Sequence, residues 1–380
     1  MFSLETKRNL PWYILIPFCI LRILWVTFNN LQCIPTYILW CFFGIPLRWA
    51  NPDLFWELEG WLFKGVLYML SGWAWTAGYT ISEVGDDISK LDTDEAIMLI
   101  NHQSTGDVPT AMTMLLNKGR AVCGSIWIID HLFKYSNFGL VSQIRGDFFI
   151  KQGKDTRERE IKALGEHLLN IFWTRHRKWL IIFPEGGFLR KRKANSQSFG
   201  RKHNLPLLHH VTLPRVGAVE MAMNTLSSSA ISNGTSSHTD TDTSRLKMGR
   251  LKWVIDVTVG YPGGKALDFQ SITSGFRQPC ETVIHFQKFP IDEVPKDTNN
   301  LKQWLYDRYI EKDAMLDQFY KTGKFPVKQQ QRSLGDDGKV LYTPKPIQLS
   351  CITLAVLHLL FLASSVFHYK VVCYLGSFIF

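Results

Sequence analysis

The stretch AIMLINHQSTGDVPT, residues 96–110, decides the fold of the chain. Residues 96–100 are apolar, and they run directly into Asn101 and His102, a small polar turn and then Asp107. Such a run predicts a buried strand, and the turn after it opens a helix. Because α/β proteins place their sites where strands end at the rim of a sheet, the stretch predicts an α/β fold with a functional site at His102.

His102 is the only one of the 11 histidines with an aspartate five residues later. Five residues turn roughly 500° of helix, about 140° net, so His102 and Asp107 must meet across the turn. There Asp107 would accept the proton of one ring nitrogen and make the other more basic. A dyad without a nucleophile suits the deprotonation of a substrate hydroxyl that attacks an acyl group. The alternative is a histidine that only completes a hydrogen bond at a turn.

A second motif, KWLIIFPEGGFLRKRK, occupies residues 178–193. A strand runs into Pro184, which ends it, and Glu185 is then displayed at a turn whose glycines permit close backbone approach. Glu185 can hydrogen-bond a polyol, and the four basic residues that follow can bind phosphate. The alternative for the basic residues is a solvated face or a patch on the membrane surface.

Apolar segments lie at both ends of the chain. Residues 10–47 carry a single charged side chain, Arg22, over far more than the ~20 residues that span a bilayer. Prolines leave open one tilted span with an interfacial piece or a helical hairpin, and without a cleavage pattern we expect a retained anchor. Residues 54–79, rich in Trp and Tyr, predict an amphipathic helix in the headgroup layer. Residues 350–380 predict a segment that crosses the membrane or lies on it.

Composition narrows the class of protein. With 46% apolar residues the chain is not disordered, and its net charge of +10 suits anionic lipid or nucleic acid. The basic residues lie beside lipid-type segments, so we expect membrane lipids as partners and no nucleic acid. The seven cysteines form no CxxC pair, so we expect no disulfide framework and no metal site, as suits a catalytic domain in the cytosol.

The middle of the chain reads as an α/β domain, a mixed sheet flanked by helices, between N- and C-terminal membrane-associated helices. We predict strands at 96–100, 139–144, 179–183, 253–261 and 282–289, and a helix at 155–175. The expected organisation is an N-terminal anchor with interfacial helices (1–84), the catalytic domain (85–326) with a mobile insertion (227–250), a linker (327–349) and a C-terminal membrane segment (350–380).

Four blocks in order resemble the glycerolipid acyltransferase family of the 1-acylglycerol-3-phosphate type. They are Asn101-His102-x4-Asp107, Gly146-Asp147-Phe148-Phe149-Ile150, Phe183-Pro184-Glu185-Gly186 and Leu213-Pro214-Arg215. The resemblance implies an enzyme of the endoplasmic reticulum that uses acyl-CoA as co-substrate, without a cofactor, to acylate a lysophospholipid. It further implies that His102 is the general base and Asp107 its orienting partner. Glu185 and Gly186 would hold the acyl acceptor, with Gly146 and Ile150 lining the same site.

The chain departs from the family pattern at two of these blocks. Gln152 stands where the second block usually has an arginine, and Gly187-Phe188 stand where the third block usually continues Thr-Arg. Both changes remove contacts expected to hold a simple phosphate, so lysophosphatidic acid becomes a less favoured acceptor. Lys151, Arg190 and Arg215 are the candidates to replace the missing charge.

The sequence thus predicts acyl transfer from acyl-CoA to the free hydroxyl of a lysophospholipid. The rival from another class is a non-catalytic membrane scaffold whose basic patch binds anionic lipid or a protein partner. The presence of both His102 and Asp107 weighs against the scaffold, and the two departures weigh mildly for it. Within the enzyme class, a transacylase with a phospholipid donor and an acyltransferase acting on a neutral glyceride stay open.

Overall fold

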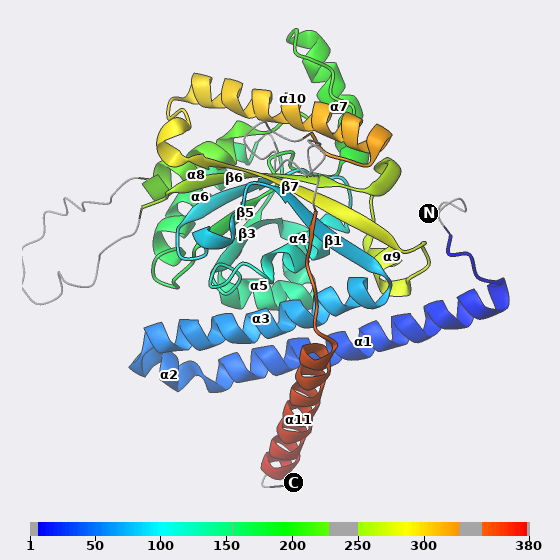
Figure 1. Ribbon diagram of the computed structural model, residues 1–380. Coiled ribbons are helices and arrows are strands. Elements are labelled where there is room, and N and C mark those ends of the chain that lie inside the picture. The colour runs from blue at the N-terminus through cyan, green and yellow to red at the C-terminus, as the bar shows by residue number, and fades with distance from the viewer. Residues whose placement is uncertain (1–6, 154, 228–249, 327–343, 378–380) are drawn as a thin grey trace, which may run out of the picture.

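The computed structural model describes residues 7–153, 155–227, 250–326 and 344–377. Its centre is an eight-stranded sheet in the order β4-β3-β5-β2-β6-β7-β1-β8 (Figure 1). The strands are β1 (Tyr79–Gly85), β2 (Ala96–Ile100), β3 (Ser125–Asp130), β4 (Phe148–Ile150), β5 (Trp179–Ile182), β6 (Trp253–Gly260), β7 (Cys280–Pro290) and β8 (Lys345–Pro346). Neighbours from β4 to β6 are parallel, whereas β6 with β7 and β1 with β8 are antiparallel. The predicted mixed α/β sheet is confirmed.

The described part of the chain contains eleven α-helices, several of which cover the two faces of the sheet. They are α1 (Trp12–Phe43), α2 (Ile45–Ala50), α3 (Pro52–Thr76), α4 (Asp107–Leu115), α5 (Asn137–Arg145), α6 (Arg157–Ile171), α7 (Leu189–Lys202), α8 (Val216–Ser227), α9 (Phe269–Ser274), α10 (Thr298–Thr322) and α11 (Cys351–Gly376). Side chains alternate across β2, so that Met98 packs with α1, α3 and α4, whereas Leu99 packs with α6, α8 and α10. Burial on both faces explains why this strand is apolar throughout.

The strand predicted at residues 139–144 is wrong, because these residues belong to helix α5. The Ser136 side chain accepts the backbone N–H of Gly139 and so caps the helix, and Gly146 ends it in the left-handed conformation at φ 86°. Apolar residues in a helix of nine residues give too short a pattern to separate it from a strand. The other predicted strands and the helix at 155–175 are present with small shifts of their ends, while β1, β3, β4 and β8 were not predicted.

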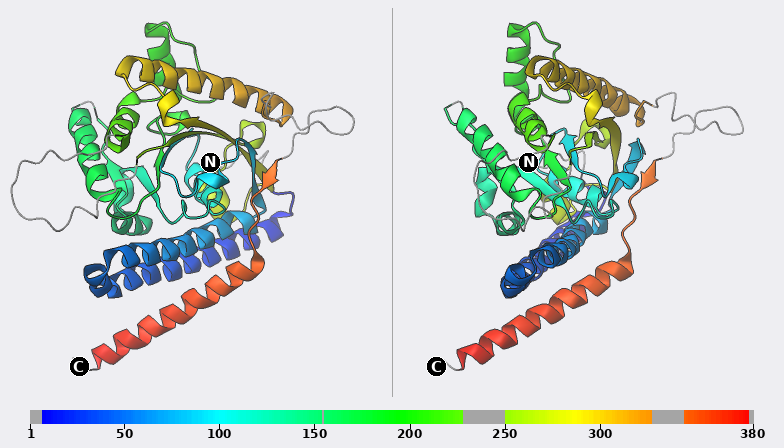
Figure 2. Two further views of the ribbon diagram at one scale, coloured as in Figure 1. Left: turned by 60° about the vertical axis from the view of Figure 1, so that its left-hand side comes forward. Right: turned by 90° about the vertical axis from the view of Figure 1, so that its left-hand side faces the viewer.

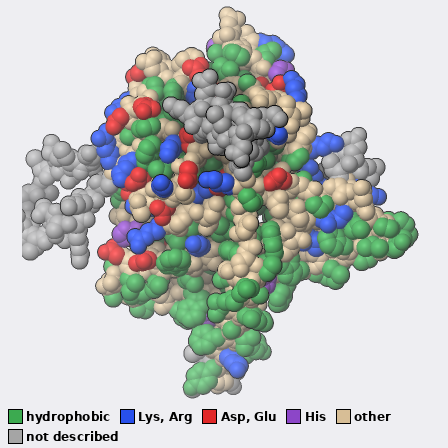
Figure 3. Space-filling model, viewed as in Figure 1, with side chains coloured by type: hydrophobic (Ala, Val, Ile, Leu, Met, Phe, Trp, Pro, Cys, Tyr) green, Lys and Arg blue, Asp and Glu red, His purple; other side chains and the backbone are tan. Residues whose placement is uncertain are grey.

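Two helices are long and apolar enough to cross a membrane, which indicates membrane association. In the most apolar window of each, only 22% of α1 and 17% of α11 is buried, so neither is an ordinary core helix. Helices α1 and α3 run side by side beneath the domain, joined by α2, and α11 projects away from it (Figures 1 and 2). Hydrophobic side chains cover α11 and the projecting end of α1 (Figure 3).

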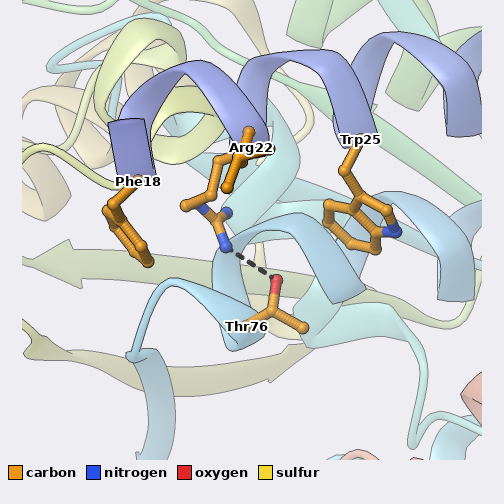
Figure 4. Close-up of a pocket in the computed structure, with 5 residues that line it drawn as sticks. Phe18, Arg22, Trp25 and Thr76 are labelled. Atoms are coloured by element: carbon orange, nitrogen blue, oxygen red, sulfur yellow. Dashed lines mark hydrogen bonds between the residues drawn. The ribbon is translucent and has the colours of Figure 1, made fainter. Parts of the chain in front are cut away.

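Arg22 ties α1 to the domain. Its guanidinium donates to Thr76 Oγ1 at 3.1 Å (Figure 4). It also donates to the Trp73 carbonyl at 2.6 Å and to a carbonyl of α9 at 3.2 Å. A pocket of about 210 Å³ lies beside it, lined by Phe18, Leu21, Arg22, Trp25 and Thr76. These bonds satisfy a charged group in an otherwise apolar helix, and they hold α1 against the sheet domain.

Helix α3, predicted to lie in the headgroup layer, has one face buried against the domain, including Trp56, Glu59 and Phe63. The sheet also takes in β1 and β8, which lie in the ranges predicted as anchor and linker. The insertion predicted at 227–250 falls almost entirely outside the described residues. All seven cysteines are free.

Candidate active site

The first predicted block forms a compact turn between β2 and α4. Asn101, directly after β2, exchanges hydrogen bonds with the backbone of Val259: its Oδ1 accepts the N–H at 2.7 Å, and its Nδ2 donates to the carbonyl at 3.2 Å. The side chain therefore fastens the end of β2 to β6. The following residue, His102, is fixed at the carboxyl edge of the sheet, where the sequence placed it.

His102 and Asp107 meet across the turn as predicted. His102 Nδ1 lies 2.8 Å from Asp107 Oδ2, and Asp107 is fully buried. A carboxylate only accepts hydrogen bonds, so Nδ1 carries the proton toward Asp107 and Nε2 keeps a lone pair. The His102 side chain is 12% exposed, and its Nε2 has no hydrogen-bond partner in the described part of the chain. The arrangement can take a proton from a group that reaches Nε2.

Two aromatic rings from the third block hold the imidazole. The centroid of Phe183 lies 4.3 Å from that of His102 in a stacked arrangement, and the centroid of Phe188 lies 4.5 Å away, edge-on. The His102 carbonyl also accepts the N–H of Leu189 at 2.8 Å. Blocks one and three therefore pack against each other around the imidazole of His102, and the two rings limit its rotation.

Glu185 is near His102, but it faces inward. It is 2% exposed. One oxygen accepts the His102 backbone N–H at 2.7 Å, and the other accepts the Thr212 N–H at 2.9 Å and the Thr212 hydroxyl at 2.8 Å. Burial raises the pKa of Glu185 to about 8, although these donors act to lower it. The carboxyl group therefore joins blocks one, three and four by hydrogen bonds to the protein itself.

Arginines cover the glycines after Glu185. The Arg215 guanidinium comes within 3.1 Å of the point where a Cβ at Gly186 would lie. Arg192 donates to the Gly186 carbonyl at 2.7 Å and to Gln152, the residue that departs from the family pattern. Burial and the nearby charges of Arg192 and Arg157 lower the pKa of Arg215. In the described residues neither Arg192 nor Arg215 forms an ion pair with an acidic side chain, so this pair of arginines can bind an anion.

The remaining predicted site residues are spread more widely. Ile150 ends β4 and is half-buried, while Lys151 and Arg190 are exposed. Gly146 precedes β4. A Cβ atom at Gly146 would contact Ile171 of α6 and Arg175, not His102. Sequence reasoning missed Arg192 as an individual residue, although it lies in the basic run. It also missed Thr212 and Tyr261, whose hydroxyl donates to Asp107 at 2.7 Å, and no local pattern marks either.

Comparisons with known proteins identify the family of the chain. The family model described as "Acyltransferase" matches residues 84–234, and that described as "Acyltransferase C-terminus" matches residues 272–348. The acyl-CoA:lysophosphatidylglycerol acyltransferase 1 of Mus musculus is 44% identical over 86% of this chain and 88% of its own length. Its Homo sapiens counterpart is 44% identical over 84% and 87%.

A crystal structure, that of the 1-acyl-sn-glycerophosphate (LPA) acyltransferase PlsC of Thermotoga maritima, aligns with 76% of this chain and 97% of its own. The TM-score is 0.40 and the identity 13%. High identity along almost the full length of the mouse and human relatives, with both family models matched in order, leaves one conclusion. The chain belongs to the acyltransferase family.

Proposed function

We propose that the protein transfers an acyl group from acyl-CoA to the free hydroxyl of a lysophospholipid, with lysophosphatidylglycerol or a related lysophospholipid as acceptor. The observation that carries the proposal is the His102–Asp107 pair, in which a buried carboxylate orients an imidazole whose Nε2 is open. The names of the mouse and human relatives supply the donor and the acceptor class.

The reaction needs one base and no nucleophile of the protein. Nε2 of His102 takes the proton of the acceptor hydroxyl while its oxygen attacks the thioester carbonyl carbon. The tetrahedral intermediate collapses by cleavage of the C–S bond, and coenzyme A leaves as a thiolate that the imidazolium can protonate. General-base help of this kind contributes ~10²- to 10⁴-fold, so positioning and charge stabilisation supply the rest. No cofactor takes part.

The acceptor phosphate would lie at the cluster of Arg192 and Arg215 beside Gly186. Arg192 reaches Gln152, so it supplies a cation where the second block lacks one. Lys151 and Arg190 are exposed and would contribute longer-range attraction. Glu185 and Gly186 act in this proposal by shaping the turn that carries the site. Gly146 and Ile150 support the fold around it.

The membrane supplies the amphiphilic acceptor. Helices α1 and α11 would hold the domain at the endoplasmic reticulum, with the site facing the cytosol, where acyl-CoA is available.

The test is acyl transfer from labelled oleoyl- and stearoyl-CoA in membranes that contain the full chain, against a panel of lysophospholipids and monoacylglycerol. We expect His102→Ala to reduce the rate by ~10²- to 10⁴-fold at equal protein level. His209→Ala removes an exposed imidazole and should keep the rate.

Equal rates in His102→Ala and the parent would overturn the role of His102 and favour the scaffold. Transfer without acyl-CoA would instead indicate a transacylase with a phospholipid donor. A preference for monoacylglycerol would remove the role proposed for the arginine cluster.

A further inference from the structure

Asp107 receives four hydrogen bonds, three of which come from its own turn. Oδ2 accepts Nδ1–H of His102 at 2.8 Å and the backbone N–H groups of Gln103 at 2.5 Å and Ser104 at 2.8 Å. Oδ1 accepts the hydroxyl of Tyr261 at 2.7 Å. Tyr261 is therefore the donor to this carboxylate that comes from another part of the sheet.

Tyr261 is held rigidly. It follows β6 directly, and β6 pairs with β2, the strand that leads into His102. The side chain is fully buried, and Thr110 Oγ1 lies 3.5 Å from its hydroxyl. Burial and the carboxylate of Asp107 raise the pKa of Tyr261 well above its ordinary value, so the hydroxyl keeps its proton and donates.

This geometry sets the orientation of the carboxylate plane. With Oδ1 fixed by Tyr261, Oδ2 is presented to the imidazole. If the hydroxyl were removed, Oδ1 would be buried without this donor, and a rotation of the carboxylate that brings Oδ1 toward other donors would move Oδ2 away from His102 Nδ1. Such a rotation would misplace the imidazole that Asp107 orients, and small misplacements of a catalytic group are costly in rate.

We propose that Tyr261 is a positioning residue of this acyltransferase: its hydroxyl fixes the Asp107 carboxylate so that Asp107 holds His102 in the reactive orientation. The inference rests on the proposed function, in which His102 is the general base. Tyr261 acts through Asp107 and does not touch the substrate.

The test is Tyr261→Phe in the full chain, assayed for kcat and for KM of both substrates. A hydrogen bond to a charged group has a strength that corresponds to a loss of about 10-fold in kcat. Both KM values should stay within about 2-fold, because no substrate contact is removed.

The matched control is Tyr309→Phe. Tyr309 is also fully buried, and its hydroxyl has no hydrogen-bond partner in the described residues. Loss of that hydroxyl should therefore leave kcat unchanged. The control thus separates the loss of the hydrogen bond to Asp107 from the general effect of removing a buried tyrosine hydroxyl.

A double-mutant cycle identifies the route. In an Asp107→Asn background, Tyr261→Phe should have little further effect, because the group that it positions is altered. A kcat of Tyr261→Phe equal to the parent, or the same fold-loss in both backgrounds, would overturn the inference. Full activity of His102→Ala would overturn the proposed function instead, and the two failures are thereby distinguished.

Discussion

Two glutamates are buried to the same degree and are held in opposite ways. Glu59 of α3 is 1% exposed, and Glu185 beside the active site is 2% exposed. Glu59 accepts hydrogen bonds from Arg145 at 2.8 Å, Arg177 at 3.2 Å and the Tyr37 hydroxyl. Glu185 accepts only neutral donors, from His102 and Thr212. Glu59 joins α1 and α3 to the sheet domain, and Glu185 joins the blocks of the site.

The difference shows that a charged partner can lower the pKa of a buried carboxyl group where neutral hydrogen-bond donors do not. Burial acts to raise the pKa of both carboxyl groups. For Glu59 the charges of Arg145 and Arg177 outweigh burial and lower the pKa, whereas for Glu185 burial prevails and the pKa is about 8. The junction of Glu59 with Arg145 and Arg177 is therefore an ion pair at neutral pH. Glu185, in contrast, has a pKa in the physiological range.

The largest effect is expected at the junction. Glu59→Ala leaves two buried guanidinium groups unpaired, and breaking a buried pair in this way costs about 3–5 kcal/mol. The free energy of unfolding of the purified full chain in detergent micelles measures it. Glu57→Ala removes an exposed glutamate of the same helix and should change the value by less than about 0.5 kcal/mol.

Should Glu59→Ala fail to fold, Glu59→Gln keeps an oxygen acceptor and should lie between it and the parent. A parent-like stability of both variants would mean that the charges of Arg145 and Arg177 are compensated elsewhere. The claim that Glu59 holds this junction by charge would then be wrong.

The next effect is a pH dependence at Glu185. Its pKa rises from 4.5 to about 8 on folding. Between these values the folded state keeps a proton that the unfolded state has lost, so stability falls as pH rises, by about 1.4 kcal/mol per unit. Because the slope flattens near each pKa, the parent should lose about 3.5 kcal/mol from pH 5 to pH 8 relative to Glu185→Gln, measured by denaturant unfolding at each pH.

Glu59→Gln is the matched control for this series. Because the pKa of Glu59 is lowered, its contribution is complete above pH 4.5 and is lost only as the pH falls below that value. The variant should therefore keep the decline between pH 5 and pH 8. Parallel curves for the parent and Glu185→Gln would instead show that the Glu185 donors, rather than burial, set its titration.

The smallest effect is expected at Thr212. Its hydroxyl donates to Glu185 at 2.8 Å and is buried with it. Thr212→Val removes this donor with little change of shape and should cost about 1–2 kcal/mol in the free energy of unfolding, whereas Thr212→Ser keeps the donor. If the two variants were equally stable, the backbone N–H groups alone would hold the carboxyl group.

The sequence predicted the site better than the sheet around it. His102 and Asp107 were paired correctly because the turn that joins them is local, and helices and strands of strong periodicity were found near their true ends. The prediction of a strand at 139–144 was wrong, because Ser136 and Gly146 cap these residues as helix α5. The sequence predicted that Glu185 is displayed at a turn, where it can hydrogen-bond a polyol. In the structure its side chain points inward and accepts the N–H of Thr212.

The amino-acid sequence by itself determined the local order of strand, turn and helix at His102, the apolar ends of the chain and the family to which the blocks belong. Hydrophobic periodicity and turn chemistry act over a few residues, so they are readable along the chain. Only the tertiary structure decided that Tyr261 reaches Asp107 across 154 residues and that Glu59 reaches Arg145 across 86. Such partners depend on the order of strands in the sheet and on which helix faces are buried, and neither is a property of a local segment.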